Sequence, residues 1–289
     1  MRTRPRRPSR LRGLSLNRLL PNILTVLALC AGLSAIRFAI QERWEAAVIA
    51  IVIAAVLDAL DGRVARLLKA SSEFGAQLDS LSDFVSFGVA PATVLYLWVM
   101  QSADRFGWMA VLTFGVCAAL RLARFNTSLG SAEKPPWAFN YFTGVPMPGA
   151  AGLVLLPPML SFQLDDAVTF HPVVVALWTI AVAMLMVSRL PTFSFKGTRV
   201  PYPYIIPVLV GVGLLAASLV SQPWLTLTLI GSAYLVSIPF SVSRYRFLER
   251  TAAQMKAEQP AGGKPALAPP EALSAPLAPS EEKTDNAER

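Results

Sequence analysis

The sequence predicts an all-α protein, a polytopic bundle of about eight helices that cross a membrane. Of its 289 residues, 54% are hydrophobic and only 15% are charged. Soluble domains carry about 25% charged residues, so this chain has too little polar surface to stay in water. Its hydrophobic residues also gather into runs near the roughly 20 residues that a membrane-spanning helix needs. We expect these spans at 19–40, 44–60, 80–100, 106–123, 145–163, 172–189, 203–220 and 223–241.

The distribution of basic residues predicts how the chain is oriented. With eight spans, most Arg and Lys residues fall on one side of the membrane, and the other side keeps only Arg37, Arg43 and Arg105. Short loops rich in Arg and Lys stay in the cytoplasm, so we expect both termini on the cytoplasmic side of the cell membrane. The net charge of +8 then reflects this topology and contact with anionic membrane lipid, with no nucleic acid as a partner.

The two ends of the chain differ in composition from the rest. Residues 1–17 form a basic leader that we expect to be flexible and cytoplasmic, and the apolar run after it is too long for a usual signal peptide. Residues 250–289 are rich in Pro, Ala, Glu and Lys, a composition that cannot bury a core and predicts a disordered cytoplasmic tail. The transmembrane domain is therefore expected at 18–245.

Four aspartates follow the second apolar run. Asp58 and Asp61 are three residues apart, and Asp79 and Asp83 are four apart. On helices both spacings place the two carboxylates on one face, so a helical hairpin would bring the pairs opposite each other. Carboxylates held this close repel one another unless a cation lies between them. Mg²⁺ and Mn²⁺ take such oxygen ligands together with substrate phosphates, which predicts a site for two of these ions.

Small and basic residues accompany the aspartates. Gly62 and Ala65 continue the helical face of Asp58, and with Gly75 they leave room for a bulky ligand near the backbone. Arg66, on the same face, can pair with phosphate oxygens. We interpret the cluster as a metal-dependent phosphoryl-type transfer site at the membrane surface. Two alternatives stay open, namely solvated acids paired with neighbouring basic residues, and an ion pathway through the membrane.

From Asp58 to Asp83 the spacing is D-x2-D-G-x2-A-R-x8-G-x3-D-x3-D. It resembles, position for position, the signature of the CDP-alcohol phosphatidyltransferases. The resemblance implies a six-helix catalytic core with a cytoplasmic site, in proteins that are often homodimers. It also implies that the aspartates bind the metals and that Asp83 is the base for the incoming alcohol. By the same resemblance, the residues that bind the CDP-lipid are Gly62, Ala65, Arg66 and Gly75, and those that bind metal are Asp58, Asp61, Asp79 and Asp83.

Further stretches resemble the phosphatidylserine synthase branch of this family. They are "LLPNILTVLALCAGLSAI" at 19–36, "RLARFN" at 121–126, "FTGVPMPGAA" at 142–151 and "MVSRLPTFSFKG" at 186–197. This resemblance implies CDP-diacylglycerol and L-serine as substrates and CMP as a product. In the first stretch, Asn22 and Thr25 are candidates for contact with the CDP-lipid, or for capping the first helix.

Serine brings a carboxylate and an ammonium group as well as its hydroxyl. The serine carboxylate would be bound by cationic side chains, and Asn126 offers a further polar contact. The same cations are also explained as ordinary loop charges on the cytoplasmic side. Other acceptors, namely glycerol 3-phosphate, inositol phosphate or choline, stay open, as do a divalent-cation transporter and a membrane scaffold. The candidate cations are Arg121, Arg124, Arg189 and Lys196.

Overall fold

The structure, a computed structural model, describes residues 16–70, 72–128, 141–164, 170–193 and 202–258. These residues are helical apart from connecting turns and a short two-stranded ribbon. Contacts divide the chain into two units, residues 1–245 and 246–289. Of the second unit only the end of the last helix is described. The predicted leader therefore lies almost wholly outside the described residues, as does the predicted tail from residue 259 onward.

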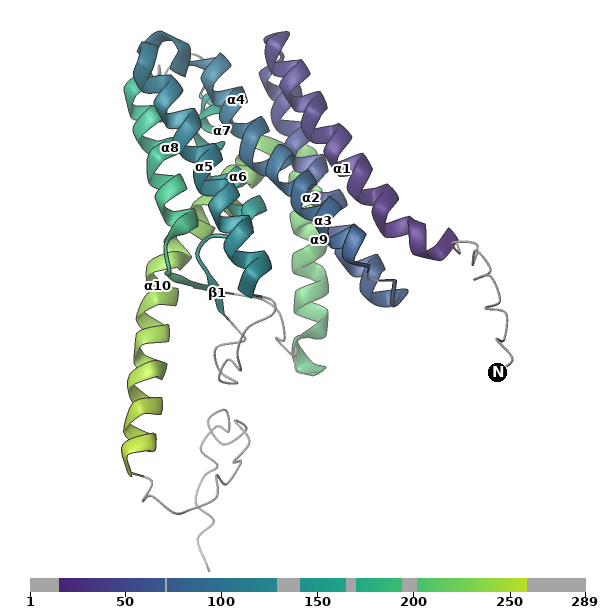
Figure 1. Cartoon of the computed structure of the whole chain (residues 1–289), viewed down its shortest axis with the longest axis vertical. Coiled ribbons are helices and arrows are strands. Elements are labelled where there is room, and N and C mark those ends of the chain that lie inside the picture. Colours follow the sequence, from purple (N-terminus) through teal and green to yellow (C-terminus); the bar gives the residue numbers. More distant parts are fainter. Residues whose placement is uncertain (1–15, 71, 129–140, 165–169, 194–201, 259–289) are drawn as a thin grey trace, which may run out of the picture. The chain divides into compact units, whose positions relative to one another are not determined.

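All eight predicted apolar runs lie on helices (Figure 1). A π-helical turn, η1, joins α3 to α4 without a break, and a 3₁₀ turn, η2, leads into α5. The fifth run is divided between the short helices α6 and α7. The elements are α1 (Leu16–Ile40), α2 (Trp44–Leu67), α3 (Glu73–Asp83), η1 (Phe84–Val89), α4 (Ala90–Trp98), η2 (Met100–Ala103), α5 (Asp104–Ser128), β1 (Tyr141–Thr143), α6 (Met147–Val154), α7 (Leu156–Ser161), α8 (Pro172–Val187), β2 (Pro191–Phe193), η4 (Tyr202–Tyr204), α9 (Ile205–Ser221) and α10 (Pro223–Glu258).

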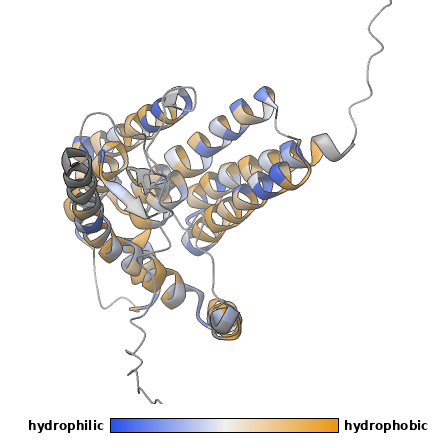
Figure 2. Cartoon of the chain, turned by 90° about the horizontal axis from the view of Figure 1, so that it is seen from below, coloured by the Kyte–Doolittle hydropathy of each residue, from blue (hydrophilic) through white to orange (hydrophobic). Residues whose placement is uncertain are grey.

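Several helices are apolar on their outer faces as well as inside the bundle (Figure 2). Leu33, Val116 and Leu177 illustrate this, since each exposes more than half of its surface, at 51%, 57% and 61%. A helix that is apolar all round suits a lipid environment, so the chain is an integral membrane protein. Within the described residues, the helices long and apolar enough to span a membrane are Leu19–Ile40, Glu73–Trp98, Met100–Thr127 and Pro223–Tyr245, with shorter apolar helices at Pro172–Val187 and Ile205–Ser221.

The helices that carry the aspartates extend beyond the predicted apolar runs. α2 continues to Leu67, and α3 begins at Glu73, seven residues before the start of the run expected at 80–100. Ser72 caps α3, because its Oγ accepts a hydrogen bond of 3.0 Å from the Gly75 N–H. Hydropathy misses these ends because their inward side chains face a polar site. α10 likewise continues to Glu258, into the segment predicted to be disordered.

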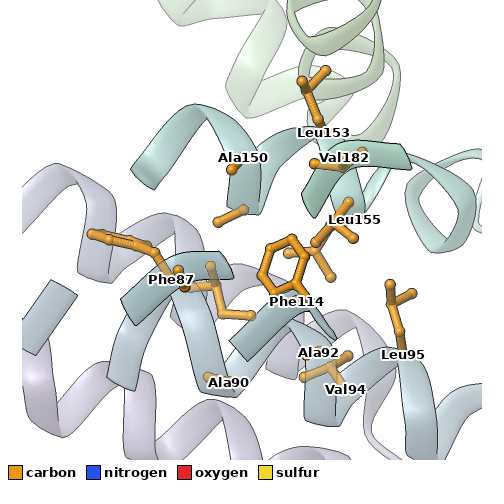
Figure 3. Close-up of a cluster of buried hydrophobic side chains, with 14 of the residues drawn as sticks. Phe87, Ala90, Ala92, Val94, Leu95, Phe114, Ala150, Leu153, Leu155 and Val182 are labelled. Atoms are coloured by element: carbon orange, nitrogen blue, oxygen red, sulfur yellow. The ribbon is translucent and has the colours of Figure 1, made fainter. Parts of the chain in front are cut away.

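The apolar core lies where η1, α4, α5, α6 and α8 meet (Figure 3). Phe87 from η1 and Phe114 from α5 are at most 1% exposed, and Leu153 and Val182 pack into the same cluster. Beside it, β1 pairs antiparallel with β2, with Phe142 opposite Thr192. This ribbon ties the segment before α6 to the end of α8. The core thus fixes α5 and α8 relative to the helix that carries Asp83.

Helix α1 is the support for both aspartate-bearing helices, since it packs along α2 and also against α3, η1 and α4. Two serines join it to the α3–η1 segment. Ser82 Oγ donates to the Thr25 carbonyl, and Ser86 Oγ donates to the Ala28 carbonyl, each at 3.2 Å. Gly32 allows this approach, because a Cβ there would lie 2.8 Å from the Ser86 Cα and would collide with its side chain.

We predict that Gly32→Ala destabilises the fold by about 1–3 kcal/mol, because the added methyl group pushes α1 away from η1. The measurement is the thermal unfolding midpoint of purified protein in detergent micelles. Gly115→Ala in α5 is the matched control, since a Cβ at Gly115 meets nothing within 4 Å and both changes raise helix propensity equally. Equal unfolding midpoints for the two variants would contradict the proposed close contact.

Candidate active site

The four predicted aspartates converge in the structure. Asp58 and Asp61 lie near the C-terminal end of α2, and Asp79 and Asp83 lie in the last turns of α3. One carboxylate oxygen from each of Asp58, Asp61 and Asp79 lies within 4.8 Å of the others. The Asp83 carboxyl group lies within hydrogen-bonding distance of Asp58 and within electrostatic reach of Asp79. The hairpin spacing therefore brings the two pairs together as the sequence predicts.

Helix α1 completes one side of this cluster. Thr25 Oγ1 donates a hydrogen bond of 2.7 Å to Asp61 Oδ2. Both side chains are buried, with 4% and 5% of their surfaces exposed, whereas Asp58, Asp79 and Asp83 are half-buried. Among the described residues, Asp61 is the only charged side chain that is buried. The group that binds the Asp61 carboxylate is the neutral hydroxyl of Thr25. It does not neutralise the negative charge as a cation would.

The donor set fits a divalent cation. Three carboxylates can each offer an oxygen to one point, and such hard oxygen ligands are those that Mg²⁺ and Mn²⁺ prefer. Without a cation, their charges repel one another in a partly desolvated position. Arg121 carries a positive charge that acts on Asp83. One guanidinium cannot balance the charges of several carboxylates. The site therefore carries an excess of negative charge that a bound metal ion would neutralise.

A cleft of about 150 Å³ opens beside the carboxylates. Residues from α1, α2, α3 and the turn between α2 and α3 form its walls. Most of the residues predicted to contact a CDP-lipid line this cleft. The exception is Arg66 on α2, whose side chain is exposed and does not belong to the lining. The lining residues are Pro21, Asn22, Thr25, Asp61, Gly62, Ala65, Ala70, Ser72, Gly75, Ala76 and Asp79.

The two glycines of the cleft serve different physical purposes. A Cβ at Gly75 would lie 2.8 Å from Asn22 Oδ1 and 3.1 Å from Ser72 Oγ, so a side chain there would have to displace the polar ends of these two residues. A Cβ at Gly62 would meet no atom within 4 Å. Packing therefore does not explain Gly62, and the space beside it is open to a ligand.

Sequence reasoning did not select four of the lining residues as site residues. Pro21, Ala70, Ser72 and Ala76 are small or compact and lie close in sequence to predicted site residues. The sequence could have identified Ser72, because serine is a typical residue at the N-terminal cap of a helix, where its side chain accepts a hydrogen bond from the N–H three residues later. The other three depend on how α1 packs against the hairpin, which no local pattern specifies.

The candidate serine-binding residues of α5 make different contacts. Arg121 Nε donates to the Val145 carbonyl at 2.7 Å, and its terminal nitrogens make no hydrogen bond to another described residue. Arg124 instead donates from Nη1 to Val187 O at 3.0 Å and from Nη2 to Ser188 O at 3.3 Å. It thus satisfies carbonyls at the C-terminal end of α8.

The remaining candidates have no interaction with the carboxylates within the described residues, or lie outside the described chain. Asn126 Nδ2 donates to Ser80 Oγ at 3.1 Å, which links the end of α5 to α3. Arg189 follows α8 and is exposed. Lys196 lies outside the described residues. The structure therefore places Arg121, of the four candidate cations, in the electrostatic neighbourhood of Asp83.

Comparisons with known proteins match most of this chain. A CDP-diacylglycerol–serine O-phosphatidyltransferase of Mycobacterium leprae is 40% identical over 242 residues, which cover 84% of this chain and 80% of that protein. A protein of the same name from Helicobacter pylori strain 26695 is 31% identical over 230 residues, covering 80% and 92%. Another from Bacillus subtilis is 34% identical over 177 residues, covering 61% and 91%.

Two family descriptions match separate parts of the sequence. The profile for CDP-alcohol phosphatidyltransferase matches residues 18–188, which include every predicted residue of the aspartate cluster and the cleft. The profile for CDP-alcohol phosphatidyltransferase 2 matches residues 203–239. The first match alone covers more than half of the 289 residues. This chain belongs to the CDP-alcohol phosphatidyltransferase family.

Proposed function

We propose that this protein is a phosphatidylserine synthase. It would transfer the phosphatidyl group of CDP-diacylglycerol to the hydroxyl of L-serine and release CMP. The observation that carries the proposal is the meeting of Asp58, Asp61 and Asp79 within 4.8 Å of one another beside an open cleft. The choice of serine as the acceptor is supported by the names of the relatives from three bacterial genera.

The family is divalent-metal dependent, and we propose two Mg²⁺ or Mn²⁺ ions bordered by Asp58, Asp61, Asp79 and Asp83. Such ions, when bound, offset the negative charge of a diphosphate and of the departing nucleotide. The cleft walls at Gly62, Ala65, Gly75 and Asn22 would hold the nucleotide. Arg66 would reach phosphate oxygens from the exposed face of α2. Thr25, also expected among the nucleotide contacts, lines the same cleft.

The proposed reaction needs no covalent enzyme intermediate. Asp83 would accept the proton of the serine hydroxyl while the serine oxygen forms a bond to the phosphorus that bears the lipid. The bond from that phosphorus to the CMP oxygen breaks, and CMP leaves with the bonding electrons. Asp83 then returns its proton to solvent. The neighbourhood of Asp83, which includes Asp58, Asp79 and Arg121, supports this proposed role.

For the serine carboxylate we propose Arg121 as the binding residue. Its Nε is fixed by the Val145 carbonyl, which orients the guanidinium while leaving both terminal nitrogens for an acceptor. A guanidinium can bind a carboxylate through two parallel hydrogen bonds. Arg124 is the less suitable candidate, because two of its nitrogens already serve the end of α8. Arg189 and Asn126 would line the approach of the acceptor, and Lys196, outside the described residues, stays a candidate from the sequence.

We further propose the eight-span arrangement with cytoplasmic termini in the cell membrane. α1, α2, the α3–α4 segment, α5, the α6–α7 pair and α8 would form the six-helix core. This division is supported by the family profile, which ends at residue 188, directly after α8. The positive-inside rule would place the aspartate cluster at the cytoplasmic surface. Homodimer formation is carried over from the family as part of the proposal.

The first test is a panel of acceptors with purified protein in detergent micelles. With CDP-diacylglycerol and Mg²⁺ or Mn²⁺, we expect CMP release with L-serine, and loss of that release with EDTA. Glycerol 3-phosphate, inositol phosphate and choline should release none. Release with one of these in place of serine would keep the family chemistry and reject the acceptor. No release with any acceptor, together with metal flux in vesicles, would favour a transporter.

The Asp83→Asn variant is predicted to lose about 10²–10⁴-fold in kcat, because it removes the proton acceptor but keeps the size of the side chain. Its KM for CDP-diacylglycerol should stay close to that of the unmodified protein. Asp58→Asn should instead weaken Mn²⁺ binding, since that carboxylate belongs to the three-residue cluster. Steady-state CMP release and Mn²⁺ titration separate the two effects. Normal turnover in Asp83→Asn would refute the role of this base.

Arg121→Gln is predicted to raise the KM for L-serine about 10- to 100-fold, the loss expected for hydrogen bonds to a charged group. The KM for CDP-diacylglycerol should not change. Arg124→Gln is the matched comparison from the next turn of α5, and it should lower the unfolding midpoint while leaving the serine KM alone. If the Arg124 variant raises the serine KM and the Arg121 variant does not, the two roles have been assigned the wrong way round.

A further inference from the structure

Thr25 is placed between the backbone of its own helix and a carboxylate of the next. Its hydroxyl oxygen lies 3.0 Å from the Pro21 carbonyl, one turn earlier in α1, and 2.7 Å from Asp61 Oδ2. A hydroxyl has one hydrogen to donate, and both of these partners are acceptors. The shorter contact and the charge of the carboxylate favour the bond to Asp61. Buried at 4% exposure, Thr25 has no freedom to turn elsewhere.

The backbone of the same residue contacts the other aspartate helix. The Thr25 carbonyl accepts a hydrogen bond of 3.2 Å from Ser82 Oγ, one residue before Asp83. One residue of α1 thus holds a carboxylate of α2 through its side chain and the final turn of α3 through its carbonyl. The distance between the two aspartate pairs depends on this junction.

We infer that Thr25 is a positioning residue for Asp61, and that it prepares this carboxylate for a divalent cation. By donating to Oδ2 it fixes the rotation of the carboxylate and leaves the other oxygen uncommitted to α1. Groups that orient metal ligands in this way are typically worth about 10- to 100-fold in metal affinity or activity. The inference rests on the proposed function, in which Asp61 is a metal ligand, and it reassigns a residue that the sequence suggested as a nucleotide contact.

The rival roles of Thr25 make distinct predictions. As a wall of the cleft it has access to a nucleotide. As a threonine in a membrane helix it also resembles Thr179, whose buried hydroxyl donates to the Val175 carbonyl at 2.8 Å and contacts no carboxylate. A positioning role changes metal affinity, a nucleotide contact changes CMP affinity at saturating metal, and a purely structural role changes neither.

The experiment is a titration of purified protein in detergent micelles with Mn²⁺ alone, following free Mn²⁺ by electron paramagnetic resonance. We expect Thr25→Val, which keeps the size of the side chain but removes the hydroxyl, to weaken Mn²⁺ binding about 10- to 100-fold. Thr25→Ser, which restores the donor, should bind within a few-fold of the unmodified protein. Thr179→Val is the matched control and should bind Mn²⁺ normally. CMP affinity at saturating Mn²⁺ should be the same in all four proteins.

Unchanged Mn²⁺ affinity in Thr25→Val would overturn the inference, as would a loss confined to CMP affinity. If the valine variant is not monodisperse, Thr25→Ala repeats the test without a donor, and full Mn²⁺ affinity there would also count against the inference. These outcomes differ from failure of the proposed function, which would show as no Mn²⁺ binding by the unmodified protein and no CMP release with serine. That result would overturn both.

Discussion

The mutual repulsion of four carboxylates is the constraint on which the rest of the site depends. Charges a few ångströms apart, screened by little water, would drive α2 and α3 apart if nothing held them. The opposing force comes from α1, which packs against both helices and is bonded to both through Thr25. A bound cation removes the repulsion itself. Metal affinity and the packing of these three helices are therefore parts of one free-energy balance.

The same arrangement explains why small residues surround the acids. The Asn22 amide lies against α3 at Gly75, where an added side chain would displace it, so the two residues close the cleft at one point. Gly62, with open space beside its Cα, keeps the cleft wide at another. Two glycines in one sequence pattern thus have opposite effects on the shape of the cavity. A bulky part of a ligand therefore has room beside Gly62 on α2.

Local periodicity accounts for what could be predicted from the sequence. The apolar runs predicted the helices, and the three- and four-residue spacings predicted which aspartates share a face, because both depend only on helix geometry. The contacts of Thr25 with Asp61 and of Arg124 with the end of α8 join residues 36 and 63 positions apart. Such contacts depend on how helices pack against each other. Charge alone therefore made Arg121 and Arg124 equal candidates for binding a carboxylate, whereas their hydrogen bonds in the structure differ.

The position of the acids within the bundle also bears on the rival idea of an ion pathway. Beyond Asp83 the chain enters η1, where Phe87 belongs to the buried apolar cluster that also contains Phe114, Leu153 and Leu155 (Figure 3). An ion crossing a membrane needs polar groups along its route. The buried hydroxyls of Ser82 and Ser86, on either side of Asp83 in the sequence, already donate to carbonyls of α1. Since the carboxylates open onto a cleft at one end and face an apolar core at the other, their geometry favours a reaction with a substrate that enters and leaves from the same side.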